Sequence, residues 1–326
     1  MKELDRTGQP PRDTDPQQRT LPLEGIPVSY TQGGSGPPLL LVHGWGGSSS
    51  YWATTLERCT NKHTCYVPDL PGYGKTPPVQ GKSASAESLA DFVVAFADAL
   101  KLDQFDLNGH SFGGAVAAYV AARHPERVRH LVLTCFGTFG TELEQQLVSQ
   151  AYYQMDLTLT MSKPWLMLWQ PWMSAWQRCV AEAGKTTSAP KDLARPFFHR
   201  LPTDAAMLNK GYTDFTCMDY RSSLESATSL GAPSLRAALQ SISAPVLLIS
   251  ARQDLMIMPA RVEGAARLIS NARIAWIDQC GHIPMIERPE EYNRLLCAFL
   301  STDPDQHDLS FFFPLSSGEP GNPGEE

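Results

Sequence analysis

The sequence has no apolar run close to the ~20 residues that span a bilayer. Its first 18 residues are polar and lack the apolar core of a secretory signal. An excess of basic residues is missing too, because 34 acidic residues outweigh 27 Lys and Arg and leave a net charge of −7. A nucleic-acid partner is therefore not expected, since no basic face is available to displace counterions from phosphates. We predict a cytoplasmic protein without a membrane partner.

Cys-x-x-Cys pairs are also absent, and the seven cysteines are scattered along the chain. This distribution suits reduced thiols better than a disulfide framework or a zinc site. His63, His124, His130, His199 and His307 show no metal-ligand spacing. The sequence also contains neither a phosphate-binding Gly-x-x-x-x-Gly-Lys motif nor a dinucleotide-binding motif. We expect no metal, no cofactor and a small-molecule substrate. The sequence carries no signal of oligomeric state.

What the sequence does contain is an alternation of apolar strands and helices. The continuous apolar run at 39–42 is typical of a strand buried on both faces of a parallel sheet, and further apolar strands are predicted at 128–134 and 246–249. Between them, the stretch 85–100 carries its apolar residues on one face of a helical period. This alternation predicts an α/β fold with a mainly parallel sheet and helices on both faces.

The alternation stops after residue 136, where helical segments rich in Met, Gln, Trp and Tyr and broken by prolines begin. It resumes with the strand at 246–249, so the intervening stretch predicts a helical insertion. The acidic end, rich in Pro and Gly, favours disorder. The expected organisation is a disordered arm at 1–18, a core at 19–136 and 231–301, a helical cap at 137–230 and a mostly disordered tail at 302–326.

A Gly-x-Ser-x-Gly pattern spans Gly109–Gly113, with Ser111 at its centre. A short apolar run precedes it, and an alanine-rich helix former follows it without a breaker before Pro125. Strand, tight turn and helix are the context of a nucleophile elbow, in which the glycines avoid collisions with the neighbouring strand and helix. Ser111 is therefore the predicted nucleophile.

A serine hydroxyl needs a base, and the base needs a third group that holds its tautomer. His282 fits as the base, because it follows a late strand and a glycine that permits a tight loop. Asp254 follows the 246–249 strand and is the predicted acid. The alternative position for the acid is at the end of the 128–134 strand, at residues 135–137, and it contains no acidic residue. Asp278 is a weaker candidate for the acid than Asp254, because it lies on the same loop as His282.

The tetrahedral intermediate of acyl transfer needs donors for its oxyanion. One predicted donor is the backbone N–H of Phe112, at the positive end of the elbow helix. The other is the backbone N–H of Trp45, in the loop after the 39–42 strand. His43, in the same loop, is expected to hold the loop and not to act as a catalyst.

Together these motifs resemble the α/β-hydrolase superfamily, in the group with a helical cap. The chain order Ser111, Asp254, His282 is the order of that superfamily. The likeness extends over about residues 25–300. It consists of His43-Gly44-Trp45, Asp69-Leu70-Pro71-Gly72-Tyr73-Gly74, Gly109-His110-Ser111-Phe112-Gly113-Gly114, His124-Pro125-Glu126-Arg127-Val128 and Gly281-His282-Ile283-Pro284-Met285-Ile286-Glu287-Arg288-Pro289.

The resemblance also separates subfamilies. Haloalkane dehalogenases and epoxide hydrolases of this fold use an aspartate nucleophile. Because position 111 is Ser, an alkyl-enzyme ester of the kind these enzymes form is not expected. The stretch 108–113 departs from the elbow usual in proline iminopeptidases. Ring-cleavage C–C hydrolases use the same three residue types and remain open, although the tryptophan that many of them carry soon after the histidine is missing at 283–286.

Trp165, Trp169, Trp172 and Trp176 are spaced to share one face of a helix, which Pro171 interrupts. They either pack the cap onto the core or roof an apolar pocket above Ser111. Under the second reading, Trp165, Trp169 and Trp172 are the predicted pocket residues.

The resulting hypothesis is a serine hydrolase that cleaves carboxylic esters of small to medium apolar acids through an acyl-enzyme. The alternatives are a C–C bond hydrolase, acyltransferase or thioesterase with the same triad. A non-catalytic ligand-binding protein on a hydrolase scaffold is the remaining reading.

Overall fold

The structure, a computed structural model, describes residues 14–138 and 172–303, together with a few single positions between these ranges. Eight strands of this part form one sheet in the order β1-β2-β4-β3-β5-β6-β7-β8. The two pairings of β2, with β1 and β4, are antiparallel, and the others are parallel. The predicted α/β class with a mainly parallel sheet is thus confirmed. The strands are β1 (Gln17–Leu23), β2 (Ile26–Gly34), β3 (Pro38–Val42), β4 (Thr64–Pro68), β5 (Phe105–His110), β6 (Val128–Thr134), β7 (Val246–Ala251) and β8 (Ala272–Ile277).

The apolar runs that predicted parallel strands lie at the centre of this sheet. β5 and β7 are buried along their whole length, as helices on both faces require. β1 begins at Gln17, which pairs with Gln32 of β2, so the strand starts inside the segment expected to be a disordered arm. Residues 1–13, and the predicted tail from residue 304, lie outside the described residues.

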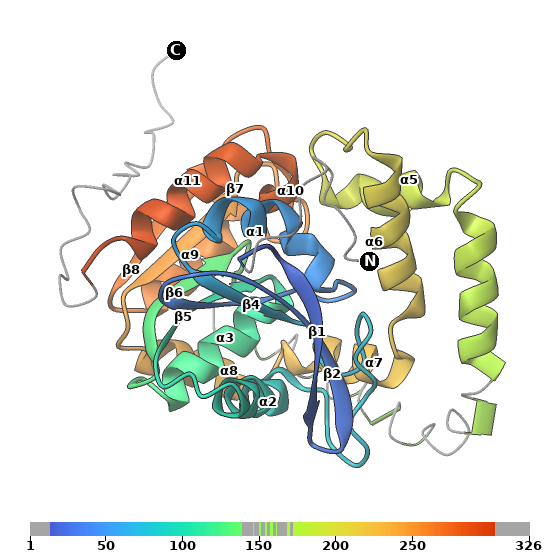
Figure 1. Cartoon of the computed structure of the whole chain (residues 1–326), viewed down its shortest axis with the longest axis horizontal. Helices are drawn as coiled ribbons and strands as arrows, with labels where there is room; N and C mark the ends of the chain where they lie inside the picture. Colours follow the sequence, from blue (N-terminus) through green and yellow to red (C-terminus); the bar gives the residue numbers. More distant parts are fainter. Residues whose placement is uncertain are drawn as a thin grey trace.

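Helices cover both faces of the sheet (Figure 1). The apolar side chains divide into one cluster on each face. Ser85 caps α2 by accepting from the Ser88 N–H, and Pro289 opens α11, where a missing N–H costs nothing. One face carries α2 (Ala86–Ala99), α3 (Phe112–Arg123), α8 (Pro233–Ser241) and α9 (Pro259–Leu268), and the other carries η1 (Ser49–Trp52), α1 (Ala53–Cys59), α10 (Pro284–Glu287) and α11 (Pro289–Leu300).

Between β6 and β7 the chain leaves the sheet and forms helices on one side of it (Figure 1). Within the described residues of this stretch there is no strand. We call its helical residues 172–184, α5 (Ala189–Ala194), η2 (Arg195–Phe197), α6 (Ala205–Cys217) and α7 (Tyr220–Ser229) the excursion helices.

The excursion helices expose tryptophans. The Trp169, Trp172 and Trp176 side chains are 57%, 75% and 70% exposed. The spacing predicted a shared helix face, but these rings neither pack the helices onto the core nor point inward. Helical periodicity groups residues on one face without fixing the direction in which that face points. Trp165 lies outside the described residues.

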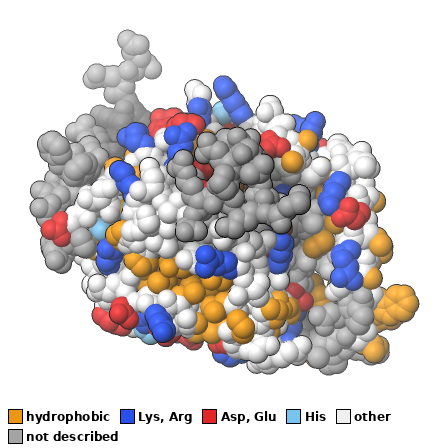
Figure 2. Space-filling view, in the orientation of Figure 1, with side chains coloured by type: hydrophobic (Ala, Val, Ile, Leu, Met, Phe, Trp, Pro, Cys, Tyr) orange, Lys and Arg blue, Asp and Glu red, His pale blue; other side chains and the backbone are white. Residues whose placement is uncertain are grey.

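On the coloured part of the face in Figure 2, basic and acidic side chains are interspersed. Among the described residues, no helix combines the length and apolar character needed to cross a membrane.

Candidate active site

Ser111 lies in the sharp turn between β5 and α3. Its φ of 52° and ψ of −116° place a non-glycine residue in a strained conformation. The surrounding glycines permit the turn: a Cβ on Gly109 would lie 2.1 Å from the Gly113 carbonyl oxygen, and one on Gly113 would lie 2.4 Å from the His43 carbonyl oxygen. The predicted strand–turn–helix context is therefore present, and it projects Ser111 from the carboxyl edge of the sheet.

The structure brings the three residues predicted as a triad together at this edge. Ser111 Oγ lies 2.9 Å from His282 Nε2, and His282 Nδ1 lies 2.7 Å from Asp254 Oδ2. Because a carboxylate only accepts, Nδ1 carries the proton and Nε2 can accept from the Ser111 hydroxyl. The three residues follow β5, β7 and β8, whose parallel carboxyl ends meet at one edge.

The carboxylate of Asp254 is buried and held from several sides. Its other oxygen accepts from the N–H groups of Met256 and Ile257, at 2.8 and 3.0 Å. The Cys135 thiol, at the end of β6, is also beside it. Burial and then the charge of Asp254 raise the pKa of the Cys135 thiol well above its ordinary value, so the thiol keeps its proton. The alternative position for the acid thus holds a neutral neighbour of Asp254.

The loop that carries His282 is fixed through its backbone. The His282 N–H donates to the Phe197 carbonyl of η2 over 2.7 Å, and the His282 carbonyl lies 2.8 Å from His110 Nε2. Gly281 allows the first contact, because a Cβ there would lie 2.6 Å from the Phe197 carbonyl oxygen. No local sequence pattern points to His110, because its side chain contacts a residue that is 172 positions away in sequence.

The predicted oxyanion donors, Trp45 and Phe112, flank Ser111 in the lining of one cavity. His43 lies behind the loop, where its Nε2 accepts from the Leu70 N–H at 3.0 Å and its Nδ1 donates to the Gly44 carbonyl at 2.9 Å. Burial lowers the pKa of His43. A neutral imidazole with both nitrogens engaged holds the loop, as expected, and is not available as a base.

A cavity of about 760 Å³ opens above Ser111 between the sheet edge and the excursion helices. This volume suits a small organic ligand. Trp169 and Trp172 are absent from its lining, so the pocket prediction is wrong for these two residues. The apolar lining comes instead from Tyr51, Leu193, Phe197, Phe198, Met207, Leu208, Tyr212, Phe215, Ile257, Ile283 and Ile286.

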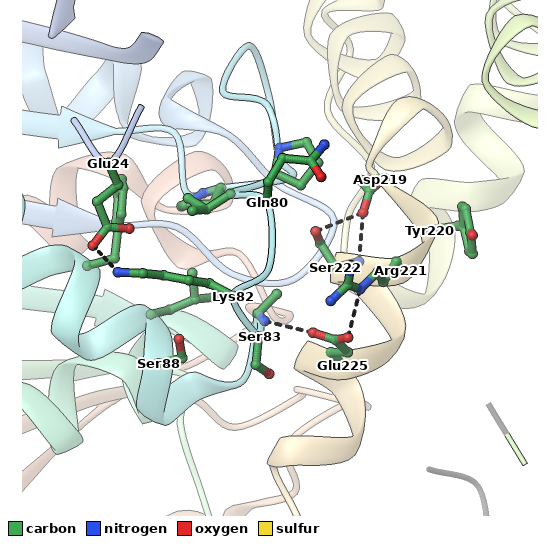
Figure 3. Close-up of a pocket in the computed structure, with 16 residues that line it drawn as sticks. Glu24, Gln80, Lys82, Ser83, Ser88, Asp219, Tyr220, Arg221, Ser222 and Glu225 are labelled. Atoms are coloured by element: carbon green, nitrogen blue, oxygen red, sulfur yellow. Dashed lines mark hydrogen bonds and ion pairs between the residues drawn. The ribbon is translucent and has the colours of Figure 1, made fainter. Parts of the chain in front are cut away.

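A smaller cavity, of about 110 Å³, lies between α7 and the loop that precedes α2 (Figure 3). Its wall mixes polar and apolar side chains and contains none of the triad residues. Glu225 accepts from the Ala84 N–H at 2.9 Å and from Arg221 at 3.0 Å, and Asp219 accepts from Ser222 at 2.8 Å (Figure 3). The bond to Ala84 joins α7 to the core, whereas the other two lie within α7 and its N-cap.

The donor atoms of one group, Cys135, Asp254 and His282, lie close enough to hold a metal ion, within 4.8 Å of one another. Two of its members are the predicted acid, Asp254, and the predicted base, His282. Since the proton on His282 Nδ1 occupies the lone pair that a metal would need, the arrangement fits a hydrogen-bonded pair better than a ligand set.

The sequence model of the alpha/beta hydrolase fold matches residues 37–289. The chain belongs to this family and is a hydrolase enzyme. This confirms the resemblance drawn from the motifs.

Individual relatives act on different substrates. The chain is 29% identical over 277 residues to pyrrolizixenacetamide deacetylase of Xenorhabdus hominickii, which covers 85% of this chain and 95% of the relative. It is 26% identical to 2-hydroxymuconate semialdehyde hydrolase of Pseudomonas sp. strain CF600, with 89% and 96% covered. It is also 26% identical to pimeloyl-[acyl-carrier protein] methyl ester esterase of Nitrosomonas europaea, with 79% and 94% covered. A solved membrane phospholipase A superposes with a TM-score of 0.67 at 25% identity, covering 88% of this chain and 86% of that one.

Proposed function

We propose that this α/β hydrolase cleaves carboxylic esters of small to medium apolar acids through an acyl-enzyme intermediate. The observation that supports it most is the hydrogen-bonded series from Ser111 through His282 to Asp254 at the floor of an apolar cavity. The names of an esterase and a phospholipase among its relatives agree with ester substrates. The excursion helices serve as the cap that closes the cavity.

In the proposed mechanism, Ser111 Oγ attacks the ester carbonyl while His282 Nε2 takes its proton. Asp254 keeps the proton of His282 on Nδ1 and stabilises the imidazolium that forms. The backbone N–H groups of Phe112 and Trp45 donate to the oxyanion. His282 then protonates the leaving alcohol, and water, activated by the same imidazole, releases the acid.

The cavity supports an apolar acyl group. Its lining is largely aromatic and aliphatic, and the basic group on α6, Lys210, is already paired with Asp214. Arg261 also lines the cavity, so it is the largely apolar wall, and not a lack of cations, that disfavours a charged acyl group.

A series of p-nitrophenyl esters of graded acyl length tests the function. The wild-type protein is expected to turn over at least the shorter members and to take a covalent label from a fluorophosphonate. Ser111→Ala should abolish both, with an unchanged circular dichroism spectrum. Ester turnover by Ser111→Ala at the wild-type rate would refute the mechanism.

A C–C bond hydrolase with the same triad is a second candidate, and the similarity to 2-hydroxymuconate semialdehyde hydrolase favours it. Parallel assays with the p-nitrophenyl esters and with a vinylogous diketone of the kind formed by ring cleavage distinguish an ester hydrolase from a C–C bond hydrolase. Turnover of the diketone with a kcat/KM far above that of every ester would replace the ester proposal.

A further inference from the structure

The loop of residues 43–50, which carries Trp45, is held at its ends by the core. His43 accepts from the Leu70 N–H at 3.0 Å, and the Ser49 N–H donates to the Asp69 carboxylate at 2.7 Å. Both partners directly follow β4. These contacts hold the two ends of the loop against the sheet.

The middle of this loop contacts the excursion helices. The Trp45 indole N–H donates to the Ser223 carbonyl of α7 over 2.7 Å, and its ring meets the Phe215 ring of α6 edge to face at 5.3 Å. Gly46 has a φ of 72°, and a Cβ there would lie 2.6 Å from the Phe215 ring. The excursion helices therefore press directly on the residue that the proposed function assigns to the oxyanion.

Asp214, on α6, is the polar anchor of this contact. Its side chain is buried, and one carboxylate oxygen accepts from the hydroxyls of Ser48 and Ser50, at 2.7 and 3.1 Å. Its other oxygen accepts from Lys210, one turn earlier on the same helix. Bonds to an ionised acceptor are stronger than neutral ones, and burial restricts the competition from water.

The helix that carries Asp214 also forms a wall of the large cavity. Met207, Leu208, Tyr212 and Phe215 of α6 line it. One rigid helix thus contacts both the space for the acyl group and the loop beside Ser111.

We propose that Asp214 is a positioning residue for the oxyanion hole: by holding Ser48 and Ser50 from α6, it sets the direction of the Trp45 backbone N–H. The inference rests on the proposed function, in which that N–H receives the oxyanion. An oxyanion donor contributes to catalysis only when it is held in place before the reaction, because reorienting it during the reaction costs part of its effect. Asp214 supplies this hold from a different part of the chain.

Asp214→Ala tests the inference, with Thr213→Val as the matched control. Thr213 is the preceding residue on α6, and its hydroxyl bonds within the helix, to the Asn209 carbonyl. With a p-nitrophenyl ester, Asp214→Ala should lower kcat by about tenfold or more, while KM stays within about threefold. A trifluoromethyl ketone, which binds as a tetrahedral adduct, should lose affinity by a similar factor. The affinity for the product acid should hardly change, and Thr213→Val should match the wild type.

An unchanged kcat for Asp214→Ala, or a rise in KM alone, would overturn the inference. Ser48→Ala removes the shorter of the two hydroxyl bonds to Asp214 from the core side and should lower kcat in the same direction. If Asp214→Ala does not fold by circular dichroism, Ser48→Ala decides by the same criteria. A wild-type protein that neither hydrolyses esters nor takes the fluorophosphonate label would refute the proposed function and this inference with it. An active wild type with an equally active Ser48→Ala would overturn the inference alone.

Discussion

His110 and His282 are joined by a hydrogen bond between the His110 Nε2 atom and the His282 carbonyl oxygen, over 2.8 Å. The residue next to Ser111 thereby holds the loop that carries His282. Since a carbonyl only accepts, the His110 proton lies on Nε2. Nδ1 is left as an acceptor, buried and without a hydrogen-bond partner in the described part of the chain.

His110→Phe should lower both activity and stability. The variant keeps a planar ring but leaves the buried His282 carbonyl without its donor, which costs about 1–3 kcal/mol in the free energy of unfolding. The kcat for ester hydrolysis should fall several-fold, because the loop that carries the base is less well held. Urea unfolding and steady-state kinetics measure the two effects. His199→Gln, at an exposed position, should change neither; wild-type kcat in His110→Phe would show that the bond does not position the base.

His110 should also make the free energy of unfolding depend on pH. Burial, and then the electrostatic effect of the neighbouring His282 ring, lower the pKa of His110 to about 3. Between the ordinary histidine pKa of about 6.5 and that value, the unfolded chain binds a proton that the folded chain does not, so stability falls as the pH decreases. Burial also lowers the pKa values of His43 and His63.

His110→Phe removes one of these three groups. Its free energy of unfolding should therefore fall less steeply than that of the wild type between pH 6.5 and 4.5, by up to about 1.4 kcal/mol per pH unit. Urea titrations at several pH values give both slopes. Parallel slopes for the variant and the wild type would show that His110 is protonated in the folded state.

The choice of acid can be tested by a pair of isosteric substitutions. Asp254→Asn should lower kcat by about three to four orders of magnitude, because an amide no longer holds the proton of His282 on Nδ1. Asp278→Asn is the control, since Asp278 is exposed and pairs with Arg252 at 3.2 Å. Its kcat should stay within twofold of the wild type by the p-nitrophenyl ester assay. The reverse order of effects would assign the acid to Asp278.

The elbow glycine should tolerate no side chain. A Cβ on Gly113 would lie 2.4 Å from the His43 carbonyl oxygen and 2.6 Å from that of Val42, both backbone atoms at the carboxyl end of β3. Gly113→Ala should lower the free energy of unfolding by about 1–3 kcal/mol or more. Gly211→Ala is the counterpart within α6, where a Cβ meets nothing within 4 Å; it should raise the free energy of unfolding by up to about 1 kcal/mol. Thermal denaturation of both variants measures the contrast, and equal stabilities would contradict the packing argument.

The features of this protein that have a local cause could be predicted from the sequence. Glycine spacing around Ser111 reports a turn that only glycines allow, and continuous apolar runs report strands covered on both faces. Because parallel strands share one carboxyl edge, residues that follow them, such as Asp254 and His282, can be expected near Ser111 before any coordinates are known.

Only the tertiary structure decided the direction in which the tryptophan face points. It alone also decided the contacts between side chains that are far apart in sequence. Periodicity placed Trp169, Trp172 and Trp176 on one face, but whether that face meets protein or solvent depends on how the helix docks. The contact of Asp214 with Ser48 joins residues 166 positions apart, and no local pattern encodes such a distance. Local sterics and hydrophobic periodicity can be read along the chain, whereas burial and pairing depend on every element that packs around a residue.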